Sequence, residues 1–274
     1  MVQIRWLGAA GLEIKNDNHA LLIDPYFTRI GKRQIFFGRP NPDNNSVKRY
    51  LADMPETLAG IIITHTHFDH AMDAPAFASH TKCPVLGSQS LAALLNINGI
   101  YDRVTVCEDQ APHELVGNTR AWMLPSSHGR VLFGRVPYPG EIIMTPARLP
   151  LRARDYRLGR VYAPLMEVGG STFMHVGSAN FRADAVSEYR CDVLFLCVPG
   201  WRSVPGYPEQ LIDIVQPKVV IPFHFDNFSV PIKAGGKISR LPFLDMKGFL
   251  DRIYNRFPRI EIRMPEIFQP MVFD

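Results

Sequence analysis

Ten residues constrain the fold and chemistry of this chain more than any other stretch: Ile61-Ile62-Ile63-Thr64-His65-Thr66-His67-Phe68-Asp69-His70. The three isoleucines predict a short buried strand, because β-branched apolar residues pack well in sheets. Three imidazoles and one carboxylate follow it directly, and these are the ligands that a cation such as Zn²⁺ takes in catalytic sites. A lone histidine in a protein core is common. Three at this spacing behind a strand indicate a metal site instead.

The spacing of these ligands also predicts their geometry. In an extended chain the side chains of residues i and i+2 share a face, so His65 and His67 can hold one ion where the strand ends. Asp69 and His70 follow as the chain turns away, and they would point to a second position nearby. Asp73-Ala74-Pro75 supplies an N-cap residue and an early proline, so a helix is predicted to begin there.

The bulk composition sets wide limits. A chain of 274 residues can form one large domain or two small ones, and a hydrophobic content of 46% is ordinary for a globular protein. The net charge of +4 comes without a Lys/Arg-rich run, which disfavours a nucleic-acid partner but allows an anionic substrate. There is no signal-peptide pattern at the start and no apolar run of the ~20 residues that a membrane span requires. Four scattered cysteines without a Cys-x-x-Cys pair predict reduced thiols and a cytoplasmic protein.

Hydrophobic patterning predicts alternating strands and helices along the chain. Strands are expected at 3–7, 12–15, 20–24, 84–87, 104–106, 119–125, 161–168, 171–176, 192–198, 218–223 and, as the last one, 260–263. Helices are expected from 73, from 88 or 90 to about 96, at 209–215 and at 245–256. Antiparallel pairs early in the chain and two halves in which a strand ends at a histidine predict one α/β domain over 1–274, an αββα sandwich of two mixed β-sheets flanked by helices.

Two segments interrupt this pattern. Residues 25–50 carry prolines, glycines and a polar run, and predict a long loop whose aromatic residues either line a pocket or pack on the surface. Residues 130–160 predict an insertion, with five arginines at Arg148, Arg152, Arg154, Arg157 and Arg160. This insertion could be a lid that presents cations to an anionic substrate, or a solvated or dimer-facing segment.

The stretch Thr64–His70 resembles the signature of the metallo-β-lactamase fold superfamily. Further likeness lies in Trp6-Leu7-Gly8-Ala9-Ala10-Gly11, Leu22-Ile23-Asp24-Pro25 and Val219-Val220-Ile221-Pro222-Phe223-His224, which resemble the branch containing ascorbate-phosphate lactonase and N-acylethanolamine-phospholipid phospholipase D. The resemblance implies the full ligand set. His65, His67 and His128 would hold one metal, and Asp69, His70 and His224 would hold the second.

The resemblance also implies a mechanism. Two ions can share a bridging water and lower its pKa to about 7, which produces a metal-bound hydroxide at neutral pH. We expect Asp69 and His70 to act in catalysis, with Asp69 orienting the hydroxide and accepting its proton. Asp24 is either an acceptor for the second nitrogen of a ligand imidazole or part of a plain Asp-Pro turn.

The sequence departs from the superfamily pattern at two places. Most hydrolases of the superfamily have Gly-Asp where this chain has Gly177-Ser178, and that aspartate bridges both metals. Two ions are still expected, with one as the alternative, and Ser178 could hydrogen-bond a metal-bound water. Ala9-Ala10 stands where relatives in the branch often have a histidine. Tyr26, Trp201 and Arg202 are the candidate substrate contacts.

We therefore expect a metal-dependent hydrolase that uses two Zn²⁺ or Mn²⁺ ions to cleave an ester, lactone or phosphodiester bond in a small substrate, which can be anionic. The alternative is a mononuclear Fe²⁺ dioxygenase acting on a thiol-derived substrate, which needs fewer ligands than this chain retains. A nucleic-acid-processing role is disfavoured by the weak charge. Assembly into a homo-oligomer is left open.

Overall fold

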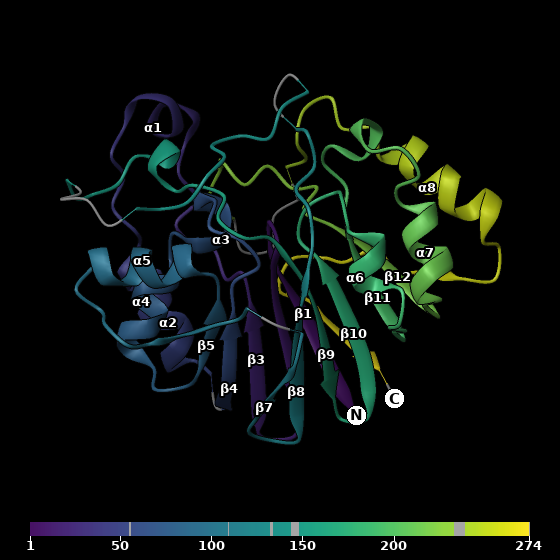
Figure 1. The fold of residues 1–274 in the computed structure, drawn as a ribbon, viewed down its shortest axis with the longest axis horizontal. Helices are drawn as coiled ribbons and strands as arrows, with labels where there is room; N and C mark the ends of the chain where they lie inside the picture. The colour runs from purple at the N-terminus through teal and green to yellow at the C-terminus, as the bar shows by residue number, and fades with distance from the viewer. Residues whose placement is uncertain (55, 109, 132–133, 144–147, 233–238, 274) are drawn as a thin grey trace.

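Two mixed β-sheets lie face to face in the computed structural model, and helices cover their outer faces (Figure 1). The structure describes the chain except for residues 55, 109, 132–133, 144–147, 233–238 and 274. The predicted αββα class is confirmed. Each sheet combines an antiparallel part with a parallel part, and the described strands of both sheets follow the same plan.

The first sheet joins the two ends of the chain. Its strand order is β14-β1-β2-β3-β4-β5-β6. The strands are β1 (Val2–Gly8), β2 (Gly11–Asn16), β3 (His19–Ile23), β4 (Thr57–Ile62), β5 (Val85–Gly87), β6 (Val104–Val106) and β14 (Pro270–Phe273). Strands β14, β1, β2 and β3 pair antiparallel, whereas β3 to β6 pair in parallel.

The second sheet repeats this plan with the order β13-β12-β11-β10-β9-β8-β7. Its strands are β7 (Pro112–Leu115), β8 (Thr119–Pro125), β9 (Tyr162–Val168), β10 (Ser171–Val176), β11 (Val193–Cys197), β12 (Val219–Phe223) and β13 (Glu261–Ile262). Strands β7 to β10 form an antiparallel meander, and β10 to β13 pair in parallel.

Alternation of side chains along the strands explains the layers. In β3, Leu21 and Ile23 belong to the apolar cluster shared with Phe173 of the second sheet, whereas Leu22 belongs to a separate cluster with Phe77 and Leu94. Those two residues come from α4 (Ala74–His80) and α5 (Gln89–Ile97), which cover the first sheet. The second sheet is covered by α6 (Ala183–Val186), α7 (Glu209–Val215) and α8 (Met246–Arg256).

The prediction of a loop over 25–50 is wrong, because two helices form there. These are α1 (Lys32–Phe37) and α2 (Asn44–Ala52). The polar run that indicated a loop begins with an N-cap: the Asp43 carboxylate accepts a hydrogen bond from the Ser46 N–H at 3.0 Å. Capping of this kind satisfies a backbone donor that the first turn leaves without a partner.

The predicted last strand is also not the last one. The chain passes β13 and continues to β14, whose residues pair with β1 from the opposite end of the sequence, for example Phe273 with Val2. The four cysteines, which all lie in the described residues, form no disulfide. Of the helices in the described residues, none has the length and apolar character that crossing a bilayer demands.

Candidate metal centre

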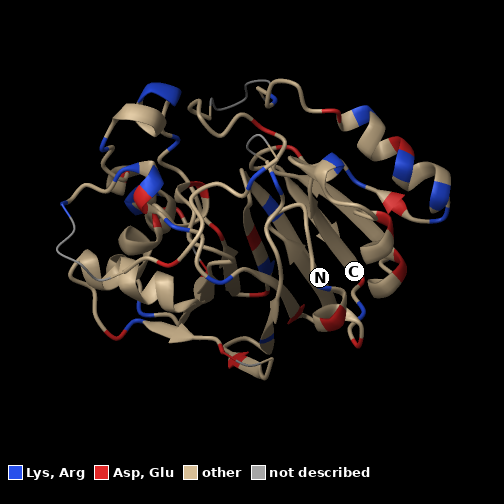
Figure 2. Cartoon of the chain, turned by 45° about the horizontal axis from the view of Figure 1, so that its top comes forward, with Lys and Arg blue, Asp and Glu red and all other residues tan. Residues whose placement is uncertain are grey.

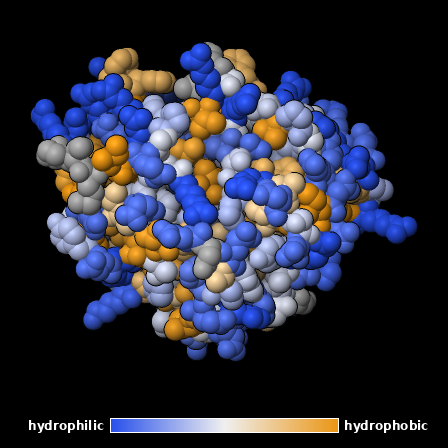
Figure 3. Space-filling model, in the orientation of Figure 1, coloured by the Kyte–Doolittle hydropathy of each residue, from blue (hydrophilic) through white to orange (hydrophobic). Residues whose placement is uncertain are grey.

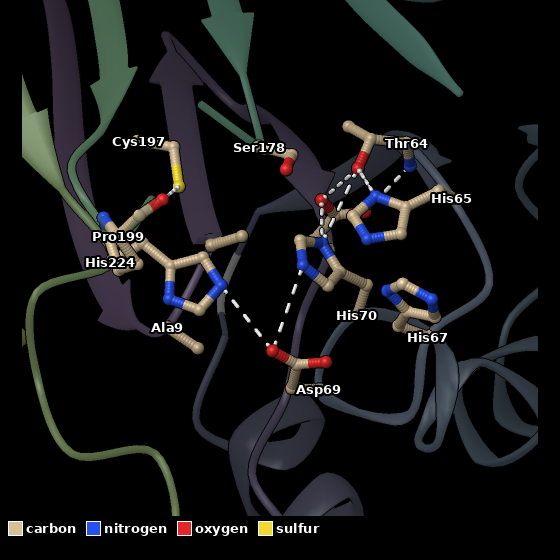
Figure 4. A network of polar contacts seen from close by, with 12 residues as sticks. Ala9, Thr64, His65, His67, Asp69, His70, Ser178, Cys197, Pro199 and His224 are labelled. Atoms are coloured by element: carbon tan, nitrogen blue, oxygen red, sulfur yellow. Dashed lines mark hydrogen bonds and ion pairs between the residues drawn. The ribbon is translucent and has the colours of Figure 1, made fainter. Parts of the chain in front are cut away.

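The predicted ligands converge where strands of both sheets end, in two groups of three. Figure 4 shows His65 and His67 of the first group and Asp69, His70 and His224 of the second. In chain order, His65 and His67 follow β4, Asp69 and His70 lie in the short helix α3 (Phe68–Ala71), His128 follows β8, and His224 directly follows β12. Parallel and antiparallel strands thus deliver ligands from segments far apart in sequence to one end of the sandwich.

The first group consists of His65, His67 and His128, whose candidate ligand atoms all lie within 4.8 Å of one another. Backbone carbonyls hold the other ring nitrogens. His67 Nε2 lies 2.8 Å from the Pro137 oxygen, which leaves Nδ1 for an ion, and His128 Nδ1 lies 2.7 Å from the Gly129 oxygen, which leaves Nε2. His65 Nε2 is buried without a hydrogen-bond partner among the described residues. Buried polar atoms are normally satisfied, so this nitrogen indicates a missing ligand.

The second group consists of Asp69, His70 and His224, again within 4.8 Å of one another. Asp69 Oδ2 lies 3.5 Å from His224 Nε2 and 3.9 Å from His70 Nε2. Figure 4 shows the Asp69 carboxylate between the two rings. His224 has a φ of +63°, a left-handed conformation that is uncommon outside glycine and asparagine and often marks functional positions. The two groups adjoin, since the ring centroids of His65 and His70 are 3.8 Å apart.

Burial sets the protonation of these groups. It lowers the pKa of His67 to about 4 and that of His128 to about 3. Burial and the repulsion of the neighbouring imidazoles also lower the pKa of His65 well below its ordinary value. Neutral rings offer lone pairs to a metal at neutral pH. Burial opposes ionisation of Asp69, but the charge of His70 and a hydrogen bond from His224 hold the pKa of this carboxyl below its usual value.

Asp24 makes the contacts predicted for an acceptor behind a ligand. Its fully buried carboxylate accepts hydrogen bonds from the Thr64 N–H at 2.7 Å and the Thr64 hydroxyl at 2.5 Å, and Oδ2 lies 2.7 Å from His70 Nδ1. Burial lowers the pKa of His70, but Asp24 and Asp69 raise it above its ordinary value. Asp24 therefore fixes the orientation of the His70 ring and increases its basicity.

Ser178 and His175 hold backbone atoms near the centre. The Ser178 hydroxyl accepts a hydrogen bond from the Gly129 N–H at 3.0 Å, which ties the end of β10 to the segment carrying His128. The water-orienting role predicted for Ser178 stays a prediction. His175 Nε2 lies 2.9 Å from the Ala10 carbonyl oxygen, so this strand histidine pairs with the backbone.

The described part of the predicted insertion packs on the ligand segment. The Thr66 N–H donates to the Leu158 oxygen at 3.0 Å, and the Thr66 hydroxyl donates to the Arg157 oxygen. The Tyr138 ring lies 6.3 Å from the His67 ring, centroid to centroid. Residues 132–133 and 144–147 of this segment lie outside the described residues, and the lid interpretation stays a prediction.

The three candidate substrate contacts each have a partner within the protein. Tyr26 is fully buried, and its hydroxyl accepts a hydrogen bond from the Ile30 N–H at 2.9 Å because the chain folds back over it before α1. Trp201 is buried against the start of α8, where its indole donates to the Asp245 oxygen at 3.1 Å. Arg202 forms an ion pair with the same aspartate. The substrate-contact role of these three residues stays a prediction.

A buried ion pair beside the centre was missed from the sequence. Arg29 Nη1 lies 2.5 Å from Asp226 Oδ2, and the two side chains are only 3% and 4% exposed. Asp226 Oδ1 accepts a hydrogen bond from the Ala9 N–H at 2.9 Å. The pair spans 197 positions, and Arg29 lies in a segment that reads as a loop, so no local pattern could have indicated it. Asp226 follows His224 by two residues.

Taken together, the donor atoms fit divalent metal ions. The first group offers three neutral imidazoles, and the second offers two imidazoles and one ionised carboxylate. Nitrogen and oxygen donors of this kind suit Zn²⁺, Mn²⁺ and Fe²⁺. The buried His65 Nε2, which has no hydrogen-bond partner among the described residues, supports the fit.

Comparison with known proteins agrees with this geometry. Residues 10–103 match the metallo-beta-lactamase superfamily. Over this segment the chain is similar to that superfamily. Its curated relatives include a UPF0173 metal-dependent hydrolase of Thermodesulfovibrio yellowstonii, which is 26% identical over 240 residues covering 82% of this chain and 79% of that protein. Another, from Pyrobaculum arsenaticum, is 25% identical over 229 residues, covering 83% of this chain and 85% of its own length.

Solved structures share the fold. Igni18, a metallo hydrolase of the archaeon Ignicoccus hospitalis, superimposes with a TM-score of 0.63 at 17% identity, covering 100% of this chain and 98% of that one. CmlA, a diiron β-hydroxylase of Streptomyces venezuelae, superimposes with a TM-score of 0.60 at 13% identity, covering 99% of this chain and 54% of that one. These structural similarities show the shared fold and do not identify the reaction.

Proposed function

We propose that this protein is a metal-dependent hydrolase whose two ions are held by the metallo-beta-lactamase domain. The observation that carries the proposal is the pair of adjoining ligand groups, three histidines in one and Asp69, His70 and His224 in the other. The metal-dependent hydrolases among its relatives support the same reaction class. Because strands from both chain ends pair in one sheet, we also propose that residues 1–274 form one domain.

Bound Zn²⁺ or Mn²⁺ would supply Lewis acidity, which lowers the pKa of water and polarises the oxygen of a scissile bond. The protein's own residues complete the chemistry. Asp69, held ionised between His70 and His224, can orient the attacking water and accept its proton at Oδ1 or Oδ2. Asp24 keeps His70 in one orientation, and the Pro137 oxygen does the same for His67.

We further propose that the substrate is a small molecule with an ester, lactone or phosphodiester bond. All three bonds place negative charge on an oxygen in the transition state, which a cationic, water-excluding site stabilises. The alternative, a mononuclear Fe²⁺ dioxygenase, uses fewer ligands, and the convergence of two complete groups weighs against it.

The first experiment is to count metal ions per chain by mass spectrometry, on protein purified without added metal. We expect close to two Zn²⁺ or Mn²⁺ in the wild type, and fewer in His67→Ala and in His224→Ala. His80→Ala is the matched control, since this exposed histidine at the end of α4 lies outside both groups. A panel of lactones, phosphodiesters and carboxylic esters then tests turnover.

Two results would contradict the proposal. One is a His67→Ala protein that keeps both its metal and its turnover. The other is one iron per chain together with oxygen consumption on thiol substrates, which would favour the dioxygenase.

A further inference from the structure

Helix α1 exposes apolar side chains, although its Ile35 packs, partly buried, against the core. None of its residues is buried, while Phe36 is 66% and Phe37 87% exposed. Their ring centroids lie 6.2 Å apart, so the two rings form one apolar surface. In Figure 1 this helix stands at the upper left, away from the sheets. A helix this short has marginal stability on its own. Two adjacent exposed aromatic rings indicate a surface that contacts another molecule or a membrane.

Cations accompany the two rings. Lys32 and Arg33 precede Phe36 and Phe37 by four residues each, and residues four apart in a helix are neighbours on one face. Both cations are exposed, and neither forms an ion pair with a described residue. Each ring therefore has an unneutralised positive charge next to it.

A second segment enlarges this surface. The Arg39 guanidinium donates hydrogen bonds to the Arg148 oxygen at 2.6 Å and to the Pro150 oxygen at 2.8 Å, which holds this segment against the end of α1. It adds the exposed Arg148 and Leu149, the latter 46% exposed. We call the six side chains of Lys32, Arg33, Phe36, Phe37, Arg148 and Leu149 the α1 patch. Figure 2 shows the basic residues on α1, and Figure 3 shows apolar surface beside hydrophilic surface at the same upper left.

We propose that the α1 patch docks the protein on the surface of an anionic lipid bilayer. Aromatic and aliphatic side chains flanked by Lys and Arg are the composition of interfacial membrane anchors, in which the apolar groups enter the acyl boundary and the cations meet the headgroups. Such docking needs no membrane-spanning helix. It goes beyond the hydrolase activity and does not depend on it.

Charge favours a bilayer over the other occupants. A symmetric dimer through the α1 patch would bring Lys32, Arg33 and Arg148 of two copies face to face, and like charges at an interface repel. A single-stranded nucleic acid could engage the same cations and stack on Phe36 and Phe37, but it would leave the aliphatic Leu149 without an apolar partner. An anionic bilayer uses both the charges and the apolar groups.

The test is co-sedimentation of the full chain with vesicles of phosphatidylcholine alone and of equal parts phosphatidylcholine and phosphatidylglycerol. One variant, Phe36→Ser/Phe37→Ser, removes the rings, and another, Lys32→Gln/Arg33→Gln, removes two charges. The matched controls are Tyr101→Ser and Lys247→Gln. Tyr101 is an aromatic residue outside the α1 patch that is 63% exposed, and Lys247 is an exposed cation on α8. We expect binding to the anionic vesicles only, reduced on the order of tenfold or more in both α1 variants, since each cation near an anionic surface contributes roughly fivefold.

Three results would overturn the proposal. The first is a failure of the wild type to sediment with anionic vesicles. The second is that both α1 variants bind the vesicles as well as the wild type does, and the third is that the control variants lose as much vesicle binding as the α1 variants. Light scattering and a gel shift with a single-stranded oligonucleotide run in parallel. Self-association or oligonucleotide binding that needs the α1 patch, without vesicle binding, would assign it to a second copy or to nucleic acid. Metal content of the α1 variants should match the wild type, which separates failure of this proposal from failure of the proposed function.

Discussion

Replacement of Arg29 by methionine tests the buried ion pair beside the metal centre. The substitution keeps the length of the side chain and removes the only cation that meets Asp226 in the described contacts. The Asp226 carboxylate would then stay buried with one remaining hydrogen bond, from the Ala9 N–H. Leaving one partner of a buried pair without the other costs about 3–5 kcal/mol of unfolding free energy, because the remaining charge has lost its solvent and its counterion.

The double variant Arg29→Met/Asp226→Asn removes both charges and keeps an oxygen for the Ala9 N–H. We expect it to be more stable than Arg29→Met, since no uncompensated charge remains buried. Arg29 itself is incompletely satisfied, with Nε and Nη2 lacking partners among the described residues, so the pair stabilises the fold less than the single variant suggests.

Urea unfolding in the presence of a chelator measures these differences without a contribution from bound metal. Arg202→Met is the matched control, because the Arg202 side chain in the ion pair with Asp245 is 72% exposed. An exposed pair of this kind should contribute at most about 1 kcal/mol to the free energy of unfolding. A cost below about 1 kcal/mol for Arg29→Met, or a double variant less stable than both single ones, would refute the reasoning. Because Asp226 follows His224 by two residues, we also expect Arg29→Met to bind its second ion more weakly.

Three further predictions concern the site and its surroundings. Asp24→Asn should weaken the metal held by His70 about 10- to 100-fold in a chelator competition, and unchanged affinity would remove Asp24 from the site. Burial raises the pKa of Asp73 to about 6. Between the ordinary pKa of an aspartate and this value, the folded state holds a proton that the unfolded state has released. The free energy of unfolding should therefore fall by about 3 kcal/mol as the pH rises from 4 to 7. Asp73→Asn should show no such decline in urea titrations across that range. Dialysis against a chelator should abolish hydrolysis and added Zn²⁺ or Mn²⁺ restore it; activity that survives full metal removal would contradict a metal-dependent reaction.

The strands were predictable because their signals are local. β12 is apolar at each of its positions, and every one is buried, as expected for a strand covered on both faces. The ten residues around His65 likewise carry both strand and ligands within one short stretch. The helix α7 also forms at the residues predicted, Glu209–Val215.

The errors arise where partners are distant or where polar residues have two uses. Asp43 looks the same in a sequence whether it caps a helix or lies in a loop, and its hydrogen bond to the Ser46 N–H decides between them. β14 is short, partly exposed and begins with proline, and it becomes a strand only because β1 offers an edge. The aromatic residues of 25–50 were expected at a pocket or on the surface, but Tyr26 is buried and its hydroxyl accepts a hydrogen bond from the Ile30 N–H.

The contrast between local signals and distant contacts also applies to the two metal groups. Their ligands lie at or shortly after strand ends. The local pattern indicates the four ligands between His65 and His70, and the family resemblance adds His128 and His224. The groups that hold those ligands are different in kind: Asp24 acts across 46 residues on His70, and Arg29 across 197 on Asp226. Such contacts exist only once the two sheets are stacked. Sequence alone can therefore name residues able to bind metal, whereas the strength of the second position, in a chain with Ser178 at the usual bridging step, depends on Asp24 and Asp226. Metal affinities of the Asp24→Asn and Arg29→Met proteins measure this dependence directly.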